Sequence, residues 1–162
     1  MAQRREYEAI VVGAGQGGVP LAMAFARHGR STALVEAVHV GGTCVNEGCT
    51  PTKTMVASAR VAHLAHRAAD YGVRTGDLSI DLERVRKRKR DIVDMFRSGS
   101  ERRVEETENL ELIRGRAAFT GPRRLEVTSA GGGRRELVAE TVVRVMKVMY
   151  RLSPRDQPSI RA

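Results

Sequence analysis

Two cysteines are the residues of this 162-residue chain whose types and spacing point most directly to chemistry. Cys44 and Cys49 lie in the stretch GGTCVNEGCTPTK, residues 41–53. Thiols at this spacing could form a redox couple, bind a metal ion or stay unreactive. A disulfide requires their Cα atoms to lie within roughly 7 Å, which a bent segment containing Gly48 allows. A loop this short adds little entropic stabilisation, which suits a bond that opens and closes.

The residues after Cys49 favour an ionised thiol at that position. Pro51 suits the first turn of a helix, because its missing N–H costs nothing there. The N-terminus of such a helix and the ammonium group of Lys53 would both stabilise a thiolate at Cys49. Zinc is the competing chemistry, but two thiols at this spacing lack a second pair of ligands, although His39 is nearby in sequence. We therefore predict no metal site.

A glycine-rich turn near the N-terminus indicates a second kind of chemistry. Gly13, Gly15 and Gly18 form the pattern G-x-G-x-x-G between the strand-like run YEAIVV and a helical run. Glycines allow the sharp turn, let a pyrophosphate approach the backbone and let the helix pack close to the strand. The start of the helix presents free N–H groups and the positive end of its dipole to the anion. The turn predicts a dinucleotide site and does not by itself distinguish FAD from NAD.

Glu36 ends the next strand-like run, STALVE, at roughly the 20-residue distance from the turn that ribose recognition requires. Its carboxylate would accept hydrogen bonds from both ribose hydroxyls and would repel a 2′-phosphate. A solvent-exposed glutamate at the end of a strand is the alternative interpretation. Strand, turn, helix and strand together predict a βαβ unit with parallel strands and a right-handed crossover.

The remaining elements must position these residues. An alanine-rich run after the cysteines predicts a helix that ends near Gly72, and a charged helix is expected from Asp81 to about Thr107. Three strand-like runs then follow, LELIRGRAAF, RLEVTSA and RRELVAETVV, separated by turn compositions. The expected fold is α/β, a Rossmann-like domain with a parallel sheet and an antiparallel β-meander.

Composition makes several partners poor candidates. The net charge of +9 includes RVRKRKR, residues 84–90, but no nucleic-acid module or stacking aromatic accompanies this run. We interpret it as a solvated helix face and predict no nucleic-acid partner. The longest apolar stretch, residues 19–26, is far shorter than the roughly 20 residues that cross a bilayer. We predict a cytoplasmic protein without a membrane partner.

The order of these motifs resembles the flavin-dependent pyridine nucleotide–disulfide oxidoreductases, which include glutathione reductase, dihydrolipoamide dehydrogenase and mercuric reductase. The shared features are a dinucleotide turn, an acidic strand end, and then Gly-Gly-Thr-Cys, Asn, Gly-Cys, Pro and Lys. The resemblance implies an FAD-binding domain. It assigns Gly13, Gly15 and Gly18 to the pyrophosphate, Glu36 to the ribose, Gly42 and Thr43 to the phosphates and nearby sugar, Lys53 to the flavin ring, and Ala117 to the adenine through its main chain.

The resemblance also implies a division of labour between the thiols. Cys49 would be the charge-transfer thiol that faces the flavin, and Cys44 the interchange thiol that faces a small-molecule substrate. Electrons would pass from NAD(P)H through FAD to the Cys44–Cys49 disulfide, and on to a thiol, disulfide or metal-ion substrate. The segment VNEGCTPTKT is most similar to the corresponding segment of mercuric reductases. A dihydrolipoamide dehydrogenase or glutathione reductase type is the alternative.

The resemblance covers roughly residues 6–143 and breaks at Arg144, where RVMKVMY replaces an expected strand ending in Ala-Thr-Gly. We therefore predict an incomplete FAD-binding domain, residues 1–143, and an off-pattern tail, residues 144–162. The expected truncation precedes the NAD(P)H and dimerisation domains through which family members form homodimers. The chain would then be an FAD-binding fragment, or a frameshifted remnant, without turnover of its own. An absent final strand also predicts an exposed sheet edge.

Overall fold

The computed structural model describes residues 3–145, so that most of the predicted tail lies outside the described residues. The elements in chain order are β1 (Gln3–Val12), α1 (Gly18–Arg27), β2 (Thr32–Glu36), α2 (Gly42–Asn46), α3 (Cys49–His66), the 3-10 turn η1 (Ala68–Tyr71), α4 (Leu82–Glu105), β3 (Leu110–Arg114), β4 (Arg116–Gly121), β5 (Arg124–Thr128) and β6 (Arg134–Arg144).

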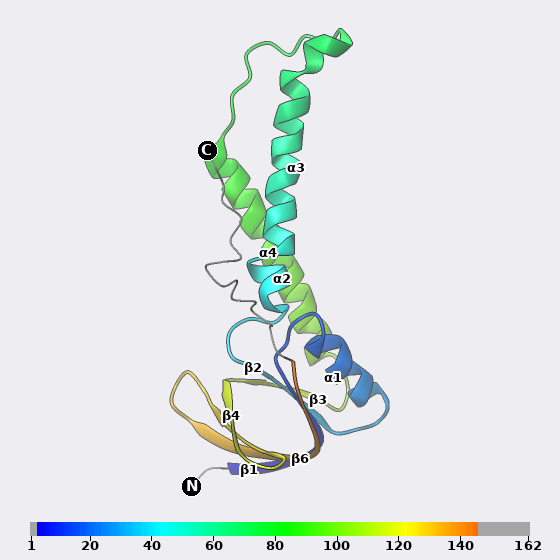
Figure 1. Cartoon of the computed structure of the whole chain (residues 1–162), viewed down its shortest axis with the longest axis vertical. Helices are drawn as coiled ribbons and strands as arrows, with labels where there is room; N and C mark the ends of the chain where they lie inside the picture. The colour runs from blue at the N-terminus through cyan, green and yellow to red at the C-terminus, as the bar shows by residue number, and fades with distance from the viewer. Residues whose placement is uncertain (1–2, 146–162) are drawn as a thin grey trace, which may run out of the picture.

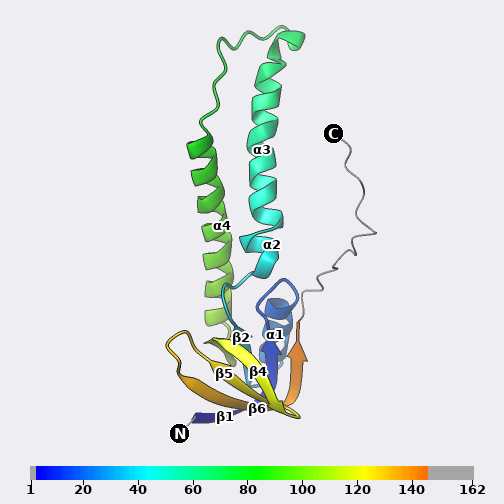
Figure 2. The same cartoon turned by 60° about the vertical axis from the view of Figure 1, so that its left-hand side comes forward.

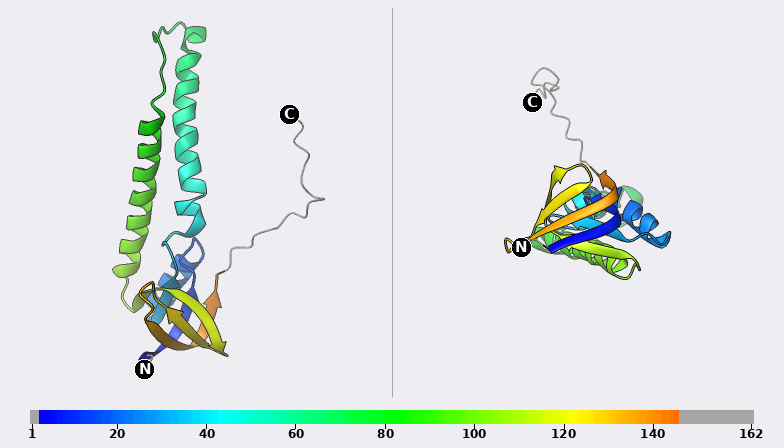
Figure 3. Two further views of the ribbon diagram at one scale, coloured as in Figure 1. Left: turned by 90° about the vertical axis from the view of Figure 1, so that its left-hand side faces the viewer. Right: turned by 90° about the horizontal axis from the view of Figure 1, so that it is seen from below.

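A single six-stranded sheet organises the fold, in the strand order β3-β2-β1-β6-β5-β4. The first four strands in this order run parallel, and β5 and β4 pair antiparallel. β1, α1 and β2 form the predicted βαβ unit, and the first four residues of β2 are all buried, as in a strand covered on both faces. Figure 3 shows the antiparallel strands curling away from the parallel part. The predicted α/β class with a meander is confirmed.

Two apolar cores lie on opposite faces of the parallel strands, because successive side chains of a strand point to opposite sides. Ile10 faces the meander and packs with Val35 and Leu137. Its neighbour Val11 faces the helices and packs with Leu34 and with Val104 of α4. The sheet is thus enclosed by the meander on one side and by α1 and α4 on the other.

The meander differs from the sequence prediction at its start. LELIRGRAAF is two strands instead of one, because β3 ends at Arg114 and β4 begins at Arg116. β3 continues the parallel sheet beside β2, so it is no part of the meander. Gly115 makes the break: a Cβ there would lie 2.7 Å from the carbonyl oxygen of Thr128. Only a residue without a side chain lets the backbone turn this close to β5.

The last strand also differs from the prediction. β6 pairs antiparallel with β5 and parallel with β1, and its pairing with β1 runs from Arg135 to Arg144. β6 occupies the position beside β1, so β3 and β4 are the edge strands of the sheet. One continuous strand performs both roles, since its first half belongs to the meander and its second half to the parallel sheet.

The helices α3 and α4 lie side by side and project from the sheet (Figure 1, Figure 2). The predicted start of α4 is confirmed, since the Asp81 carboxylate accepts a hydrogen bond from Arg84 N at 2.9 Å and caps the helix. Val93 of α4 is buried, but Leu82 and Phe96 are 50% and 51% exposed, so the apolar residues of this helix are only partly covered. No helix in the described part of the chain is long and apolar enough to cross a membrane.

Candidate active site

Cys44 and Cys49 lie on successive helices at the base of the projecting pair. Cys44 belongs to α2 and Cys49 is the first residue of α3. Gly48 N donates to the carbonyl oxygen of Thr43 at 2.7 Å, which closes the turn between the helices. A Cβ at Gly48 would lie 3.0 Å from the same oxygen, so the tight turn favours glycine. Both cysteines are free thiols.

The two thiols influence each other. Hydrogen bonding with the Cys49 side chain is the main cause that raises the pKa of Cys44, and partial desolvation adds to it. Lys53 acts in the opposite direction, since its positive charge favours a thiolate at Cys44. Lys53 stands one helical turn after Cys49 on α3. The structure therefore brings the two sulfur atoms and one ammonium group together.

Removal of the Cys49 sulfur is expected to lower the pKa of Cys44, because the hydrogen bond that raises it disappears. In Cys49→Ala, a larger fraction of Cys44 is thiolate at a given alkaline pH, so alkylation by iodoacetamide becomes faster there. Mass spectrometry of the chain at a series of pH values measures the rate. Lys53→Met should move the Cys44 profile in the opposite direction, toward higher pH. An unchanged profile in Cys49→Ala would show that the thiols do not interact.

The glycine turn lies between β1 and α1 and has the geometry of an anion site. Gly13 has a φ of +103°, and a Cβ on Gly18 would collide with the carbonyl oxygen of Gly13. A Cβ on Gly15 would meet only Gly42 Cα, at 4.0 Å, so the backbone is open on that side. Gly17 precedes α1 without any side-chain cap. In the first helical turn, Val19 N donates to the carbonyl oxygen of Gly15 at 3.1 Å and Leu21 N donates to that of Gly17 at 3.3 Å. What this end of α1 offers an anion is the positive end of the helix dipole.

The cysteine segment packs directly against this turn. Gly41 N donates to the carbonyl oxygen of Ala14 at 2.7 Å. Gly42 has a φ of +58°, and a Cβ there would lie 2.8 Å from Gly15 Cα. Glycine is required on both counts. The predicted phosphate contacts Gly15 and Gly42 are therefore neighbours, with Thr43 exposed beside them at the start of α2.

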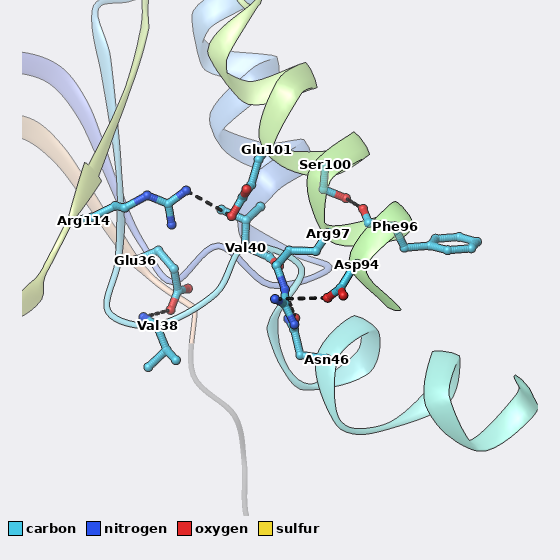
Figure 4. A network of polar contacts seen from close by, with 10 residues as sticks. All are labelled: Glu36, Val38, Val40, Asn46, Asp94, Phe96, Arg97, Ser100, Glu101 and Arg114. Atoms are coloured by element: carbon cyan, nitrogen blue, oxygen red, sulfur yellow. Dashed lines mark hydrogen bonds and ion pairs between the residues drawn. The ribbon is translucent and has the colours of Figure 1, made fainter. Parts of the chain in front are cut away.

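Glu36 ends β2 with both carboxylate oxygens held by backbone amides. Oε2 accepts a hydrogen bond from Ala14 N at 2.8 Å, and Oε1 accepts one from Val38 N at 2.9 Å. Figure 4 shows the contact with Val38. A carboxylate oxygen accepts more than one hydrogen bond, so each retains capacity for a hydroxyl donor. A cavity of about 210 Å³ beside this carboxylate is lined by Glu36, Val38, His39, Gly42, Thr43, Asn46 and Glu47.

The start of β4 lies next to Glu36, where the sequence places an adenine contact. Gly115 N donates to the main-chain oxygen of Glu36 at 2.9 Å. Ala117 follows two residues later and packs against the core between sheet and meander. Gly115 itself was missed from the sequence, because the run IRGRAAF was interpreted as one strand.

Gly115→Ala is expected to lower the free energy of unfolding by about 1–3 kcal/mol, because the new Cβ collides with backbone that cannot easily move. Urea titration followed by circular dichroism measures the change. Gly131→Ala is the matched control, since a Cβ at Gly131 meets nothing within 4 Å. Equal stability of the two variants would show that the break between β3 and β4 does not need glycine.

Two polar residues that sequence reasoning did not assign connect the cysteine segment to α4. Asn46 Nδ2 donates to the carbonyl oxygens of Gly42 at 2.8 Å and of Val40 at 3.1 Å. Arg97 Nε donates to Asn46 Oδ1 at 2.7 Å (Figure 4). Asn46 belongs to the cysteine motif GGTCVNEGCTPTK, but no role could be assigned to it from the sequence. Arg97 left no sequence signal, because the contact joins positions 51 residues apart.

The structure thus gathers the predicted residues into one region. The glycine turn, Glu36, and the segment with Gly42 and Thr43 surround the ends of β1 and β2, and the thiols with Lys53 lie just beyond. Among residues 3–145, no group of three or more His, Cys, Asp or Glu side chains could hold a metal ion.

A parallel βαβ unit with a glycine turn, an amide-held acidic strand end and a dithiol packed on the turn defines the dinucleotide domain of a dithiol flavoprotein. The chain belongs to the pyridine nucleotide-disulphide oxidoreductase family, which it matches over residues 7–143. Members of this family are FAD-dependent oxidoreductases. The family predicted from the sequence is confirmed.

Known proteins resemble the chain in sequence and in fold. Dihydrolipoyl dehydrogenase of Chlorobaculum parvum is 35% identical over 153 residues, which are 94% of this chain and 32% of the relative. The Acholeplasma laidlawii enzyme of the same name is 42% identical over 96 residues, covering 59% of this chain and 29% of the relative. The Cu(II) complex of the HOCl-induced flavoprotein disulfide reductase RclA from Escherichia coli superimposes with a TM-score of 0.73 at 28% identity, covering 93% of this chain and 30% of RclA.

This chain therefore spans about a third of the length of these relatives. The two kinds of relative carry different names, dihydrolipoyl dehydrogenase and disulfide reductase. The similarity to mercuric reductases stays a prediction.

Proposed function

We propose that residues 1–143 form an FAD-binding domain whose Cys44–Cys49 couple exchanges electrons between the flavin and a substrate. The packing of the cysteine segment on the glycine turn carries this proposal. Gly41 N is bonded to Ala14 O at 2.7 Å, so a dinucleotide on the turn would extend toward the thiols. The residues present fit the cofactor, because side chains are absent where the pyrophosphate would lie and Glu36 offers free acceptor capacity.

The proposed roles follow the positions of the residues. The glycines are assigned to the pyrophosphate because the backbone is open at Gly15 and the turn leads into the N-terminus of α1, which has no side-chain cap. Ala117 is assigned to the adenine because Gly115 ties that segment to Glu36. The cofactor-binding residues proposed are Gly13, Gly15, Gly18, Glu36, Gly42, Thr43, Lys53 and Ala117.

When bound, FAD supplies a two-electron carrier that connects a nicotinamide donor with sulfur. The disulfide accepts two electrons and one proton, which breaks its S–S bond and leaves one thiol and one thiolate. Cys44 then attacks a substrate disulfide, forms a mixed disulfide and releases one substrate thiol. Cys49, whose proton has passed to the first leaving group, attacks the Cys44 sulfur, which restores the internal S–S bond and releases the second substrate sulfur as a thiolate that takes up a proton from water. Lys53 stabilises the negative charge that the thiols carry between these steps.

The remaining parts of the reaction are proposals drawn from the family. We propose NAD(P)H as the electron donor, a cytoplasmic setting and a homodimeric assembly. Turnover would use an NAD(P)H site and interface residues that correspond to the rest of the relatives' length. The described residues would then be the module that holds FAD and the dithiol.

A metal ion is the second candidate for the substrate of the dithiol, because the cysteine motif is similar to that of mercuric reductases. Two thiols without a third ligand in residues 3–145 suit a soft ion that is held briefly and not a resident metal. RclA, which resembles this chain in fold, is described as a Cu(II) complex. Competition for the reduced chain between Hg²⁺ or Cu⁺ and a disulfide reagent would separate the candidates: protection of both thiols by an equimolar ion favours the metal substrate.

FAD binding is the direct test of the proposal. Purified chain is titrated into FAD and the quenching of flavin fluorescence is followed, with ultrafiltration to measure bound flavin. Comigration of flavin with the protein in a one-to-one ratio is expected. A chain that folds, as shown by circular dichroism, and leaves all flavin in the filtrate would contradict the proposal.

A further inference from the structure

The short helix that carries Cys44 is held from the side by one arginine of α4. Arg97 Nε lies 2.7 Å from Asn46 Oδ1, and its NH1 atom lies 3.4 Å from an oxygen of Asp94. Figure 4 shows the guanidinium group reaching both partners. The Arg97 side chain is 25% exposed, so water only partly screens its contact with Asn46.

Every polar position of the Asn46 amide has a partner. Its NH₂ group donates to the carbonyl oxygens of Val40 and Gly42, and its oxygen accepts from Arg97. Arginine offers only donors, so Arg97 requires the amide oxygen on its own side. The NH₂ group must then face the two carbonyls. In the rotated amide, donors would oppose donors and oxygens would oppose oxygens.

The helix α2 depends on the contacts of Asn46 and Arg97. It has five residues, and a helix this short is unstable without tertiary contacts. Gly41 precedes it with a φ of +95° and provides no side-chain cap. Asn46 therefore ties the last residue of α2 to its first residue, Gly42, and to the loop at Val40. Together with the bond from Gly48 N to the carbonyl oxygen of Thr43, these contacts position Cys44 relative to Cys49 on α3.

We propose that Arg97 is a positioning residue for the dithiol: it fixes the amide of Asn46 and thereby fixes the position of Cys44 relative to Cys49. The inference rests on the proposed function of these cysteines as a redox couple. A fixed α2 raises the effective concentration of one thiol at the other, which favours the disulfide at equilibrium. Arg97 acts through Asn46 and touches neither sulfur in the described contacts.

The test measures the dithiol–disulfide equilibrium in the full 162-residue chain without FAD. The chain is equilibrated with mixtures of glutathione and glutathione disulfide, then alkylated and analysed by mass spectrometry. In this exchange the two thiols form one S–S bond, and one glutathione disulfide becomes two glutathione molecules that take up both protons. Arg97→Met keeps the apolar stem and removes the donors. It is expected to lower the equilibrium constant for disulfide formation about tenfold, a potential about 30 mV less negative.

Two further variants define the role. Arg90→Met is the matched control, because Arg90 is exposed on the same helix and its side chain makes no hydrogen bond or ion pair within residues 3–145. Its equilibrium constant should stay within about twofold of the original. Arg97→Lys keeps the positive charge and an apolar stem, so it is the variant to use if Arg97→Met does not fold. Its constant should lie between those of the original chain and Arg97→Met, since an ammonium group lacks the planar fork.

A double-mutant cycle separates positioning from general stability. In an Asn46→Ala background, Arg97→Met should have no further effect on the equilibrium constant, because its only route to Cys44 is gone. Additive effects would overturn the proposal. So would a loss of unfolding free energy in urea with an unchanged equilibrium constant. If the original chain forms no disulfide in any buffer, the proposal that Cys44 and Cys49 form a redox couple is wrong. The proposed role of Arg97 is then wrong as well.

Discussion

Replacing Glu36 with alanine is expected to weaken FAD binding about 100-fold. The carboxylate is held in place by Ala14 N and Val38 N, at 2.8 and 2.9 Å, so it is ready to accept both ribose hydroxyls. Two hydrogen bonds to a charged group are worth about 1.5 kcal/mol each, and their loss corresponds to about two decades in the dissociation constant. Fluorescence titration of FAD measures this constant. Glu36→Gln, which keeps one oxygen acceptor, should lose less affinity.

Glu8→Ala is the matched control for this variant. The Glu8 carboxylate also accepts a hydrogen bond from a backbone amide, Ser31 N at 2.8 Å, but it lies near the start of β2 instead of its end. It should lose a similar hydrogen bond without losing affinity for FAD. If Glu36→Ala binds FAD as tightly as Glu8→Ala, Glu36 does not hold the ribose and the assignment of the cofactor site is wrong.

Replacing either cysteine with serine is expected to halve the electron capacity of the FAD-loaded chain. The original chain should take up about four electrons in an anaerobic dithionite titration, two in the flavin and two in the disulfide, while Cys44→Ser or Cys49→Ser should take up about two. The physical reason is that a single sulfur cannot form the internal S–S bond. Flavin absorbance and a count of free thiols measure the two components separately.

FAD affinity is the internal control for the cysteine variants. Neither thiol is assigned to the pyrophosphate or the ribose, and serine has nearly the shape of cysteine, so binding should change by less than about threefold. A chain that takes up about two electrons before any substitution would show that the cysteines are inert thiols. A variant that still takes up about four would place the second acceptor elsewhere in the protein.

Local sequence determined most of the elements that build the site. The glycine spacing and the apolar runs on either side are sufficient to predict β1, α1 and β2. These three elements depend on short-range steric and hydrophobic preferences. Asp81 marks the start of α4 for the same reason, since an N-cap acts within one turn. The order of motifs also identified the family, which the match over residues 7–143 confirms.

Strand pairing was beyond local sequence. LELIR and RRELVAETVV have the composition of meander strands, yet β3 joins the parallel sheet and β6 pairs with β1 as well as with β5. The partner of a strand is set by long-range packing, and period-two burial is the same for parallel and antiparallel neighbours. The break at Gly115 follows from the closeness of Thr128, which only the folded chain creates.

The amino-acid sequence by itself determined the chemistry of this protein: two thiols, an ammonium group one turn away, a glycine turn and an acidic strand end. The tertiary structure alone decided how they meet. It placed Gly42 against Gly15, held the carboxylate of Glu36 by two amides, and brought Arg97 of α4 onto Asn46. Residue types carry reactivity within a few positions of the chain, whereas distances between segments depend on the packing of the whole core.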